Sequence, residues 1–504
     1  MEQRKMEQRK KIKNMIAFDC SNTSVRAILG RFDGERLDIQ TLLQEENAAV
    51  RLRDYEYWDV AAIYQKMMKG LAAAVKETGQ IDSIGICTWG VDFAFFTKEG
   101  IMLGNPLCYR NPLGAEMAGR LSEAEERELF RETGLLCDKI NSLFMLQGIG
   151  KYAPSLLRAA DKLLMIPDIF NYLFTGVMSN EPSEFSTSQL MHVGSRKPSP
   201  RACREGGISS SMLSPIGIHG TRIGNLLPSI REELGIDYEI PVICVPSHDT
   251  AAAVLAIPAE EKDFAFISSG TWALIGTELE EPLMDTSVME RHLTNELGAF
   301  DRITLLKNNA GQFIIQRLRQ EYDSSLSWDQ FYQLMDASDE DVPLFDVNDN
   351  RFFNPARMGE ALWNSFLQTG QVKGAYDIGK AIKSFLLSMA LSYRDTVAEL
   401  EQVCQKDFAR LYIVGGGVRN HRLCQLAADY TGKTVITGSS ESTSYGNLLA
   451  QLKYFEPERT VESCRKLIGR SVKTVKYESR EPDERVLLRY QNILNQSISG
   501  GRKK

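Results

Sequence analysis

An aspartate at the end of an apolar run is the first residue whose type and setting suit chemistry. Asp19 closes residues 15–19 (MIAFD) and is followed by the polar turn of residues 20–24 (CSNTS). A carboxylate in that position could coordinate Mg²⁺ that bridges phosphate groups, whereas an aspartate that starts a turn often bonds to its own backbone. Arg26, on the strand-like run that follows, could neutralise phosphate charge or simply pair on the surface. The residues by themselves leave these alternatives open.

A second aspartate, Asp249, lies between a strand-like run, residues 240–245, and an alanine-rich helical run, residues 250–256. It therefore falls at or near a helix N-terminus, where it could be the N-cap. The helix dipole at that position also favours the ionised carboxylate, and an ionised carboxylate can accept a hydroxyl proton as a general base. The choice between cap and base stays open on these residues alone.

The polar turn after Asp19 has a counterpart in the second half of the chain. Residues 263–267 (DFAFI) run into residues 268–271 (SSGT) and then into residues 272–276 (WALIG). Hydroxyl groups and closely approaching backbone amides at such turns form anion pockets, although most Ser/Thr/Gly turns are only turns. The recurrence suggests two structurally duplicated halves, each with one loop that could hold phosphate.

Two further glycine-containing segments could contribute to a site. Residues 88–93 (TWGVDF) form a turn that could face a sugar, and Trp89 could contact the sugar ring or belong to the core. Residues 411–417 (LYIVGGG) precede a helix-like run, residues 420–430. If that glycine loop binds a ligand, an adenosine moiety lying against bare backbone is favoured.

The bulk composition limits the class of protein. A chain of 504 residues exceeds what one hydrophobic core usually supports, so two large domains are expected. The net charge of −7 argues against a nucleic-acid partner. The nine cysteines form no CxxC pair, which fits a reducing, cytoplasmic compartment and no structural transition metal. We find no apolar run long enough for a membrane span and no apolar segment near the N-terminus that would indicate a secretory signal. A monomer or a homodimer is expected.

Strands that alternate with helical runs indicate α/β domains. The polar, proline-bearing stretch of residues 256–263 predicts the domain boundary. We therefore expect a disordered extension, an N-terminal sugar-binding domain, a C-terminal nucleotide-binding domain and a polar tail, at residues 1–14, 15–258, 259–495 and 496–504. Residues 197–200 and 338–349 are predicted to be surface loops.

In order and spacing, these motifs resemble the FGGY family of carbohydrate kinases from about Met15 to the helix near Lys453. Within that family, the match to bacterial kinases of L-rhamnulose is close. The blocks that carry the resemblance are residues 81–93 (IDSIGICTWGVDF), 247–250 (SHDT), 268–272 (SSGTW), 306–308 (LKN) with Gln316, and 413–417 (IVGGG).

The resemblance implies an α/β fold of two actin-like (RNase H-like) ATPase domains with the active-site cleft between them. It implies transfer of the ATP γ-phosphoryl group to the 1-hydroxyl of L-rhamnulose in rhamnose catabolism, with Mg²⁺. Asp249 matches the catalytic proton acceptor, and Asp19 matches the metal-associated aspartate. The matched sugar contacts are Gly90, His248, Asp249, Thr250 and Asn308, and the matched nucleotide contacts are Asn22, Thr23, Ser24, Val25, Arg26, Thr271, Gln316 and Gly416.

The chain departs from the family pattern at four positions. Ser21 and Val25 stand in the first turn where the family usually has glycine or another small residue, and glycine permits positive φ and a closer approach. Cys87 and Asn111 replace aspartates that are common in the L-rhamnulose kinases. Two alternatives therefore remain: a kinase for another ketose, such as fuculose or xylulose, or a catalytically silent regulator that binds sugar or nucleotide.

Overall fold

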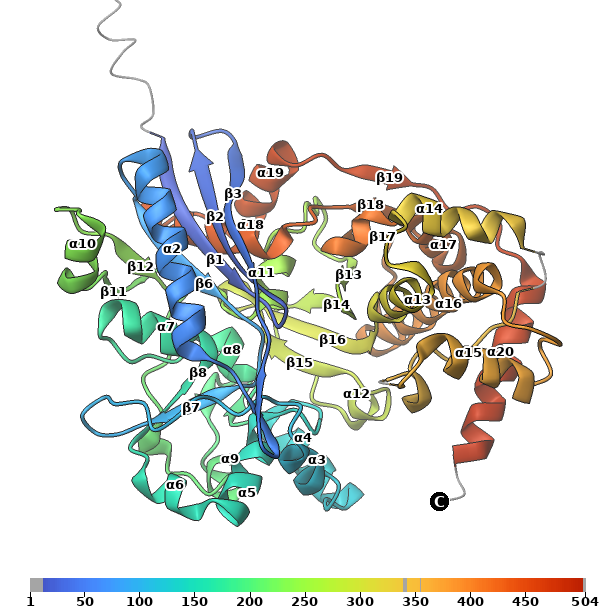
Figure 1. Cartoon of the computed structure of the whole chain (residues 1–504), viewed down its shortest axis with the longest axis horizontal. Coiled ribbons are helices and arrows are strands. Elements are labelled where there is room, and N and C mark those ends of the chain that lie inside the picture. Colours follow the sequence, from blue (N-terminus) through green and yellow to red (C-terminus); the bar gives the residue numbers. More distant parts are fainter. Residues whose placement is uncertain (1–11, 339–341, 354, 502–504) are drawn as a thin grey trace, which may run out of the picture. The chain divides into compact units, whose positions relative to one another are not determined.

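The computed structural model describes residues 12–338, 342–353 and 355–501, with side chains to Asn495 (Figure 1). The chain forms two compact units. The first contains residues 1–260, 278–305 and 441–473, and the second contains residues 261–277, 306–440 and 474–504. The chain thus changes unit near the expected boundary at residue 258, and it also returns to the first unit twice.

A six-stranded sheet forms the centre of the first unit. β1 (Lys13–Cys20) pairs antiparallel with β2 (Ser24–Phe32) and parallel with β6 (Ser83–Cys87), and its apolar residues 15–18 are fully buried between the layers that cover the sheet. The sheet order is β11 (Arg222–Asn225), β12 (Pro241–Ile243), β6 (Ser83–Cys87), β1 (Lys13–Cys20), β2 (Ser24–Phe32) and β3 (Leu37–Glu46).

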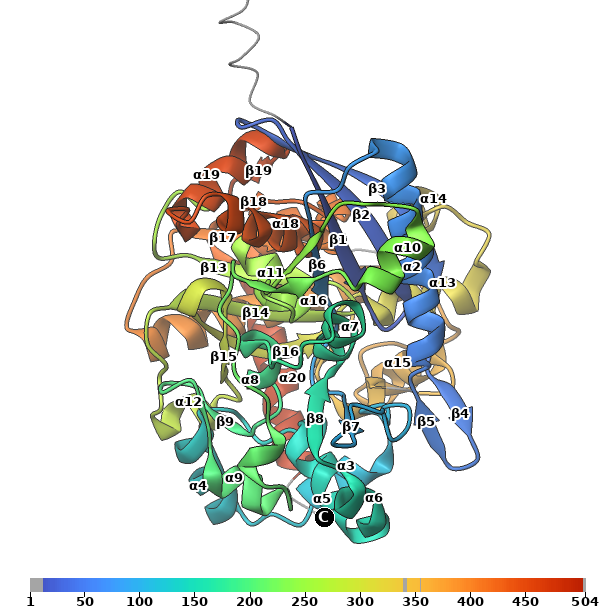
Figure 2. The ribbon, with the colours of Figure 1, turned by 90° about the vertical axis from the view of Figure 1, so that its left-hand side faces the viewer.

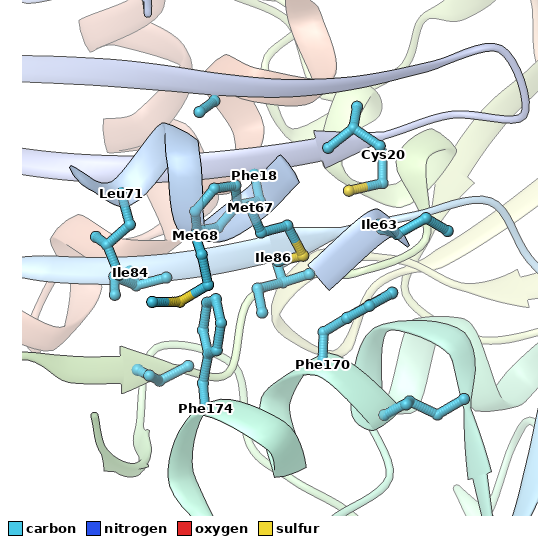
Figure 3. Close-up of a cluster of buried hydrophobic side chains, with 14 of the residues drawn as sticks. Phe18, Cys20, Ile63, Met67, Met68, Leu71, Ile84, Ile86, Phe170 and Phe174 are labelled. Atoms are coloured by element: carbon cyan, nitrogen blue, oxygen red, sulfur yellow. The ribbon is translucent and has the colours of Figure 1, made fainter. Parts of the chain in front are cut away.

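Helices cover both faces of this sheet. On one face, α2 (Val60–Thr78) and α7 (Ile166–Thr175) surround Phe18 and Ile86, and Figure 3 shows Met67, Phe170 and Phe174 packed between these elements. On the other face lie α11 (Asp249–Leu255), α18 (Ser442–Phe455) and α19 (Val461–Ser471). Burial of the sheet on both sides fixes the strand ends from which the site residues project.

A smaller lobe of the first unit surrounds the antiparallel pair β7 (Phe93–Phe96) and β8 (Lys162–Met165). Figure 2 shows its helices gathered below the sheet. Its helices are α3 (Pro112–Ala118), α4 (Glu123–Thr133), α5 (Ser142–Tyr152), α6 (Pro154–Ala159), α8 (Pro182–Ser186), α9 (Pro200–Glu205) and α12 (Thr286–Glu290). The other elements of the unit are α10 (Pro228–Leu234) and the strands β4 (Val50–Leu52), β5 (Tyr55–Tyr57), β9 (Met191–His192), β10 (Lys197–Pro198) and β15 (Thr294–Leu297).

The second unit is built on another mixed sheet. Its strands follow the order β16 (Ile303–Ala310), β14 (Trp272–Leu279), β13 (Ala265–Ser269), β17 (Arg410–Val414), β18 (Thr434–Thr437) and β19 (Val475–Tyr477). Its helices are α13 (Phe313–Asp323), α14 (Trp328–Gln333), α15 (Met358–Gln368), α16 (Ile378–Cys404), α17 (His421–Thr431) and α20 (Glu484–Gly501). Among the described residues, no helix combines the length and the apolar character that crossing a membrane requires.

The local sequence signals are confirmed. Both predicted hairpins form, as β1–β2 and β13–β14, and β17 leads through the glycine loop into α17. Asn420 caps α17, its side chain accepting the Leu423 N–H at 3.1 Å, and Gly432 ends the helix with φ +70°.

The structure differs from three other expectations, which concern the two ends of the chain and one loop. β1 begins at Lys13, inside the expected N-terminal extension, whose residues 1–11 lie outside the described residues. Helix α20 extends to Gly501, into the expected polar tail. The predicted surface loop at residues 338–349 includes residues 339–341, which lie outside the described residues, and the prediction is wrong for Leu344 and Phe345, which are buried.

Candidate active site

Asp249 is the first residue of α11, and His248 is the N-cap. The Asp249 N–H donates to the Thr88 carbonyl at 3.0 Å, and the Thr88 N–H donates to the Ser247 carbonyl at 2.8 Å. These bonds hold the start of α11 against the end of β6. Asp249 is therefore not the N-cap, and its carboxylate is available for another role.

The two oxygens of the Asp249 carboxylate have different surroundings. Oδ1 accepts a hydrogen bond from the Thr250 hydroxyl at 3.2 Å and lies 3.5 Å from His248 Nε2. Within the described part of the chain, no hydrogen bond reaches Oδ2. Because 41% of the side chain is exposed, an incoming hydroxyl group can approach this carboxylate.

His248 is buried beside Asp249, and its Nδ1 lies 3.2 Å from Oε2 of Glu296. Burial alone would lower the pKa of His248, but the charges of Glu296 and Asp249 raise it to about 9. The imidazole is therefore protonated at neutral pH. This arrangement gives the site one fixed positive charge next to the Asp249 carboxylate.

Asp19 lies at the end of β1 and is almost fully buried. Its Oδ2 accepts hydrogen bonds from Arg26 Nη2 at 2.6 Å and from Ser444 Oγ at 3.0 Å, and Arg26 Nη1 pairs with Glu441. Burial raises the pKa of Asp19 against the lowering effect of the Arg26 charge, and the Asp249 carboxylate raises it further. The Asp249 carboxylate is therefore close enough to affect Asp19 electrostatically.

The turn after Asp19 is closed by its own hydrogen bonds. The Ser21 N–H donates to the Ser24 carbonyl at 2.8 Å, and Ser21 Oγ lies 3.1 Å from Ser24 Oγ. No residue from 20 to 25 has positive φ, so the turn does not require glycine at Ser21 or Val25. The departure from the family pattern is therefore compatible with the hairpin geometry.

The predicted nucleotide contacts on this hairpin are not equivalent. Asn22 Nδ2 donates to the Tyr109 hydroxyl at 2.8 Å, and Thr23 is exposed at the tip. The Val25 side chain is fully buried in the core, so only its backbone could meet a ligand.

Gly90 provides space beside His248. A methyl group at Gly90 would lie 3.2 Å from Thr187 and 3.3 Å from His248 Nε2. Trp89 is buried; its indole donates to Asp92 at 2.9 Å and packs against Trp58, with the ring centroids 4.2 Å apart. Of the two alternatives for Trp89, the core is the one found.

The two substituted aspartate positions have structural contacts. Cys87 is the β6 neighbour of Asp19, and its buried thiol lies 3.1 Å from the Pro246 carbonyl and 3.2 Å from Asn447 Nδ2. Asn111 bonds through both side-chain atoms to the backbone of Glu56, at 2.8 and 2.9 Å. A carboxylate at Asn111 could not donate the first of these bonds.

In the second unit, the β13–β14 turn contacts two other elements. The Gln312 N–H, just before α13, donates to the Gly270 carbonyl at 3.0 Å. The backbone of Gly417 lies so close to Ser269 that a methyl group at Gly417 would be 2.0 Å from Ser269 Oγ. The turn is thus held between the start of α13 and the glycine loop.

The predicted contacts of the second unit project from these elements. Thr271 is exposed in the turn, Gln316 is exposed one helical turn after Gln312, and Gly416 is exposed in the glycine loop. Asn308 is exposed on β16.

Three residues that contact the site were missed by sequence reasoning: Glu296, Glu441 and Ser444. Glu441 is the N-cap of α18, and Ser444 lies in its first turn. The run of polar residues 439–444 before an apolar helix was an available signal for them. Glu296, on β15, carried no comparable local signal.

Comparison with known proteins gives consistent matches. The profile of the FGGY family of carbohydrate kinases, N-terminal domain, matches residues 14–256, and that of its C-terminal domain matches residues 265–454. A rhamnulokinase from Oceanobacillus iheyensis is 34% identical over 90% of this chain and 96% of its own length. A rhamnulokinase from Bacteroides thetaiotaomicron is 33% identical over 93% of this chain and 96% of its own.

Solved structures share the fold. A ligand-bound xylulose kinase from Lactobacillus acidophilus superposes with a TM-score of 0.77 at 13% identity, covering 97% of both chains. A glycerol kinase from Plasmodium falciparum with ADP gives a TM-score of 0.77 at 15% identity, covering 97% of this chain and 98% of its own. The predicted two-domain α/β fold is confirmed. The chain belongs to the FGGY family of carbohydrate kinases.

Proposed function

We propose that this protein transfers the γ-phosphoryl group of ATP to the 1-hydroxyl of L-rhamnulose. The observation that carries the proposal is the similarity to five curated proteins named rhamnulokinase, which are 29–34% identical over 90–96% of this chain. The product would be L-rhamnulose 1-phosphate, an intermediate of rhamnose catabolism.

Asp249 is the proposed general base. Phosphoryl transfer requires positioning, charge neutralisation and a group that accepts the hydroxyl proton. Thr250 and His248 both contact Oδ1, which leaves Oδ2 to accept the proton from the sugar. The neighbouring His248 imidazolium places a positive charge 3.5 Å from Oδ1 of this carboxylate.

We assign the remaining predicted residues to the two substrates. Gly90, His248, Thr250 and Asn308 are the proposed sugar contacts. The proposed nucleotide contacts are Asn22, Thr23, Ser24, Val25, Arg26, Thr271, Gln316 and Gly416, with Val25 contributing through its backbone.

Asp19 fits the role of a Mg²⁺ ligand. Its Oδ1 accepts no hydrogen bond within the described part of the chain, and carboxylate oxygen is a ligand that Mg²⁺ prefers. The described residues contain no group of three side chains able to hold a metal by themselves. That agrees with an ion held by one carboxylate together with substrate phosphates. When bound, Mg²⁺ would supply charge neutralisation at the phosphates.

A ketose panel tests the proposal. The purified chain is assayed for ADP release with ATP and Mg²⁺ against L-rhamnulose, L-fuculose and D-xylulose at matched concentrations. The proposal predicts the highest kcat/KM for L-rhamnulose. A clear preference for another ketose would contradict the substrate assignment, and no sugar-dependent ADP from folded protein would favour the silent regulator. The cytoplasmic location and the monomeric or dimeric state stay predictions.

A further inference from the structure

A row of three ionisable side chains ends at the proposed base. Glu296 Oε2 lies 3.2 Å from His248 Nδ1, and His248 Nε2 lies 3.5 Å from Asp249 Oδ1. The side chains of Glu296 and His248 are 12% and 10% exposed, whereas that of Asp249 is 41% exposed. The row therefore runs from a sheltered carboxylate to an accessible one.

The ionisable side chains around the His248 ring are mostly acidic. Glu296 faces it from β15, Asp249 from α11 and Glu181 from the residue that precedes α8. Glu181 is itself in contact with Nε2 of His219. Glu296 provides the largest effect that raises the pKa of His248, although burial alone would lower that pKa.

The backbone of His248 is fixed independently of its ring. The His248 N–H donates to Ser183 Oγ at 3.2 Å, and the backbones of Thr88 and His248 form an isolated parallel β-bridge. The two ring nitrogens face carboxylates at ion-pair distance: Nδ1 lies 3.2 Å from Glu296 Oε2, and Nε2 lies 3.5 Å from Asp249 Oδ1. Nδ1 is buried and has no other partner within the described residues, so Glu296 is the group that can hold this side of the ring.

We propose that Glu296 is a positioning residue, which holds the His248 imidazolium with its Nε2–H toward Asp249 Oδ1 so that Oδ2 is presented to the sugar hydroxyl. This inference rests on the proposed kinase function. In the step it serves, the O1–H proton moves to Asp249 Oδ2 while the bond from O1 to the γ-phosphorus forms. The bond from the γ-phosphorus to the bridging oxygen breaks, and its electron pair leaves with ADP.

The proposal has a direct test in the protonation of His248 itself. The chain has five histidines, so NMR of ¹³C-labelled histidine can follow each ring, and the signal lost in His248→Gln assigns His248. In the wild type, we expect His248 to titrate at about 9. In Glu296→Gln, we expect its pKa to fall by about one pH unit or more, because one carboxylate charge is removed.

Glu184→Gln is the matched control. Glu184 is also a buried glutamate of this unit, and neither of its oxygens has a partner within the described residues. Burial raises its pKa well above the usual range, which favours the neutral carboxyl that glutamine imitates. We expect the pKa of His248 to be unchanged in this variant.

The pH dependence of kcat separates positioning from a merely structural role. The alkaline limb of the kcat profile should move to lower pH in Glu296→Gln by the same amount as the pKa of His248. For a fall of one pH unit in the pKa of His248, we expect kcat to be about threefold lower than in the wild type at pH 8.5 and nearly equal to it at pH 6. Glu296→Asp, which keeps the charge, should restore most of the alkaline limb.

Each outcome decides the proposal. A shifted His248 pKa with a shifted kinetic limb supports it, and a shifted pKa with an unchanged limb overturns it. An unchanged pKa in Glu296→Gln also overturns it. If that variant does not fold, a wild-type His248 that titrates at or below 6.5 overturns it. If the wild type phosphorylates no sugar, the proposed function fails, and the inference about catalysis falls with it, even where the NMR titration confirms the ion pair.

Discussion

A methyl group at Gly446 should disturb the site without changing any residue that carries chemistry. Gly446 lies on α18 where that helix crosses α11. A carbon atom added there would be 1.8 Å from the carbonyl oxygen of Ala252, on α11, whereas such contacts are essentially never below 3.0 Å. In Gly446→Ala the two helices must therefore separate locally by about 1 Å, because packed interiors have no spare space.

Separation of α11 and α18 should lower both the stability of the protein and its turnover. Overpacking of this kind costs about 1–3 kcal/mol. Helix α11 begins with Asp249, and α18 supplies Ser444 to Asp19. Since a misplacement of about 1 Å can lower a rate by about 100-fold, we expect kcat to fall by about that factor.

Gly469→Ala is the matched control for this prediction. Gly469 lies inside α19 of the same unit, and the nearest atom to an added methyl group is 4.0 Å away. Alanine there should raise helix stability by about 0.5–1 kcal/mol and leave turnover unchanged. Thermal melting and sugar-dependent ADP release measure both variants. A Gly446→Ala protein with wild-type melting and a kcat within twofold of the wild type would refute the packing argument.

Two further variants test the nucleotide side and the pH dependence. Gly417→Ala would place a methyl group 2.0 Å from Ser269 Oγ, so we expect the KM for ATP to rise by about tenfold or more with the sugar KM little changed; an equal rise in both would contradict the nucleotide assignment. Burial raises the pKa of Asp92 to about 7 despite hydrogen bonds from two indole groups, so this residue binds a proton more tightly in the folded state than in the unfolded one. The stability that proton binding by Asp92 contributes is therefore lost as pH rises from about 4 to about 7, and the free energy of unfolding falls by at most about 4 kcal/mol. Relative to the wild type, the melting temperature of Asp92→Asn should improve from pH 5 to pH 8, and a difference that does not change with pH would show that Asp92 does not titrate in this range.

Sequence reasoning succeeded where the signal is local. The hairpin after Asp19 was predictable because an apolar run, a polar turn and a second apolar run adjoin in the chain. The helix after Asp249 was predictable for a similar reason. Whether Asp249 is the N-cap could not be decided from the residues, since its place inside α11 depends on the Thr88 carbonyl that accepts its N–H.

The partners of the site residues could not be found from local patterns. Ser444 lies 425 residues after Asp19, and Glu296 reaches His248, the N-cap of α11, from strand β15. Residues 278–305 and 441–473 return to the first unit without any linker-like composition that would announce the change. Such contacts follow from the assembled fold rather than from spacing.

The predicted surface loop at residues 338–349 failed for a different reason. Its acidic residues suggested a surface loop, but apolar residues stand between them, and Leu344 and Phe345 are buried. The Phe345 N–H is satisfied by Ser388 Oγ at 3.1 Å, so this irregular segment can be buried without losing a backbone hydrogen bond. Charge composition alone therefore misjudged the burial.

The central claim is that Asp249 removes the proton from the sugar hydroxyl. Asp249→Asn keeps the size of the side chain and lets Oδ1 accept the Thr250 hydrogen bond, but it cannot accept a proton as a base. Single-turnover phosphorylation of L-rhamnulose by this variant, with the sugar Kd measured separately, tests the claim directly. We predict a rate at least about 100-fold below the wild type with a sugar Kd within about threefold. A variant that binds the sugar normally and phosphorylates it at the wild-type rate would contradict the account.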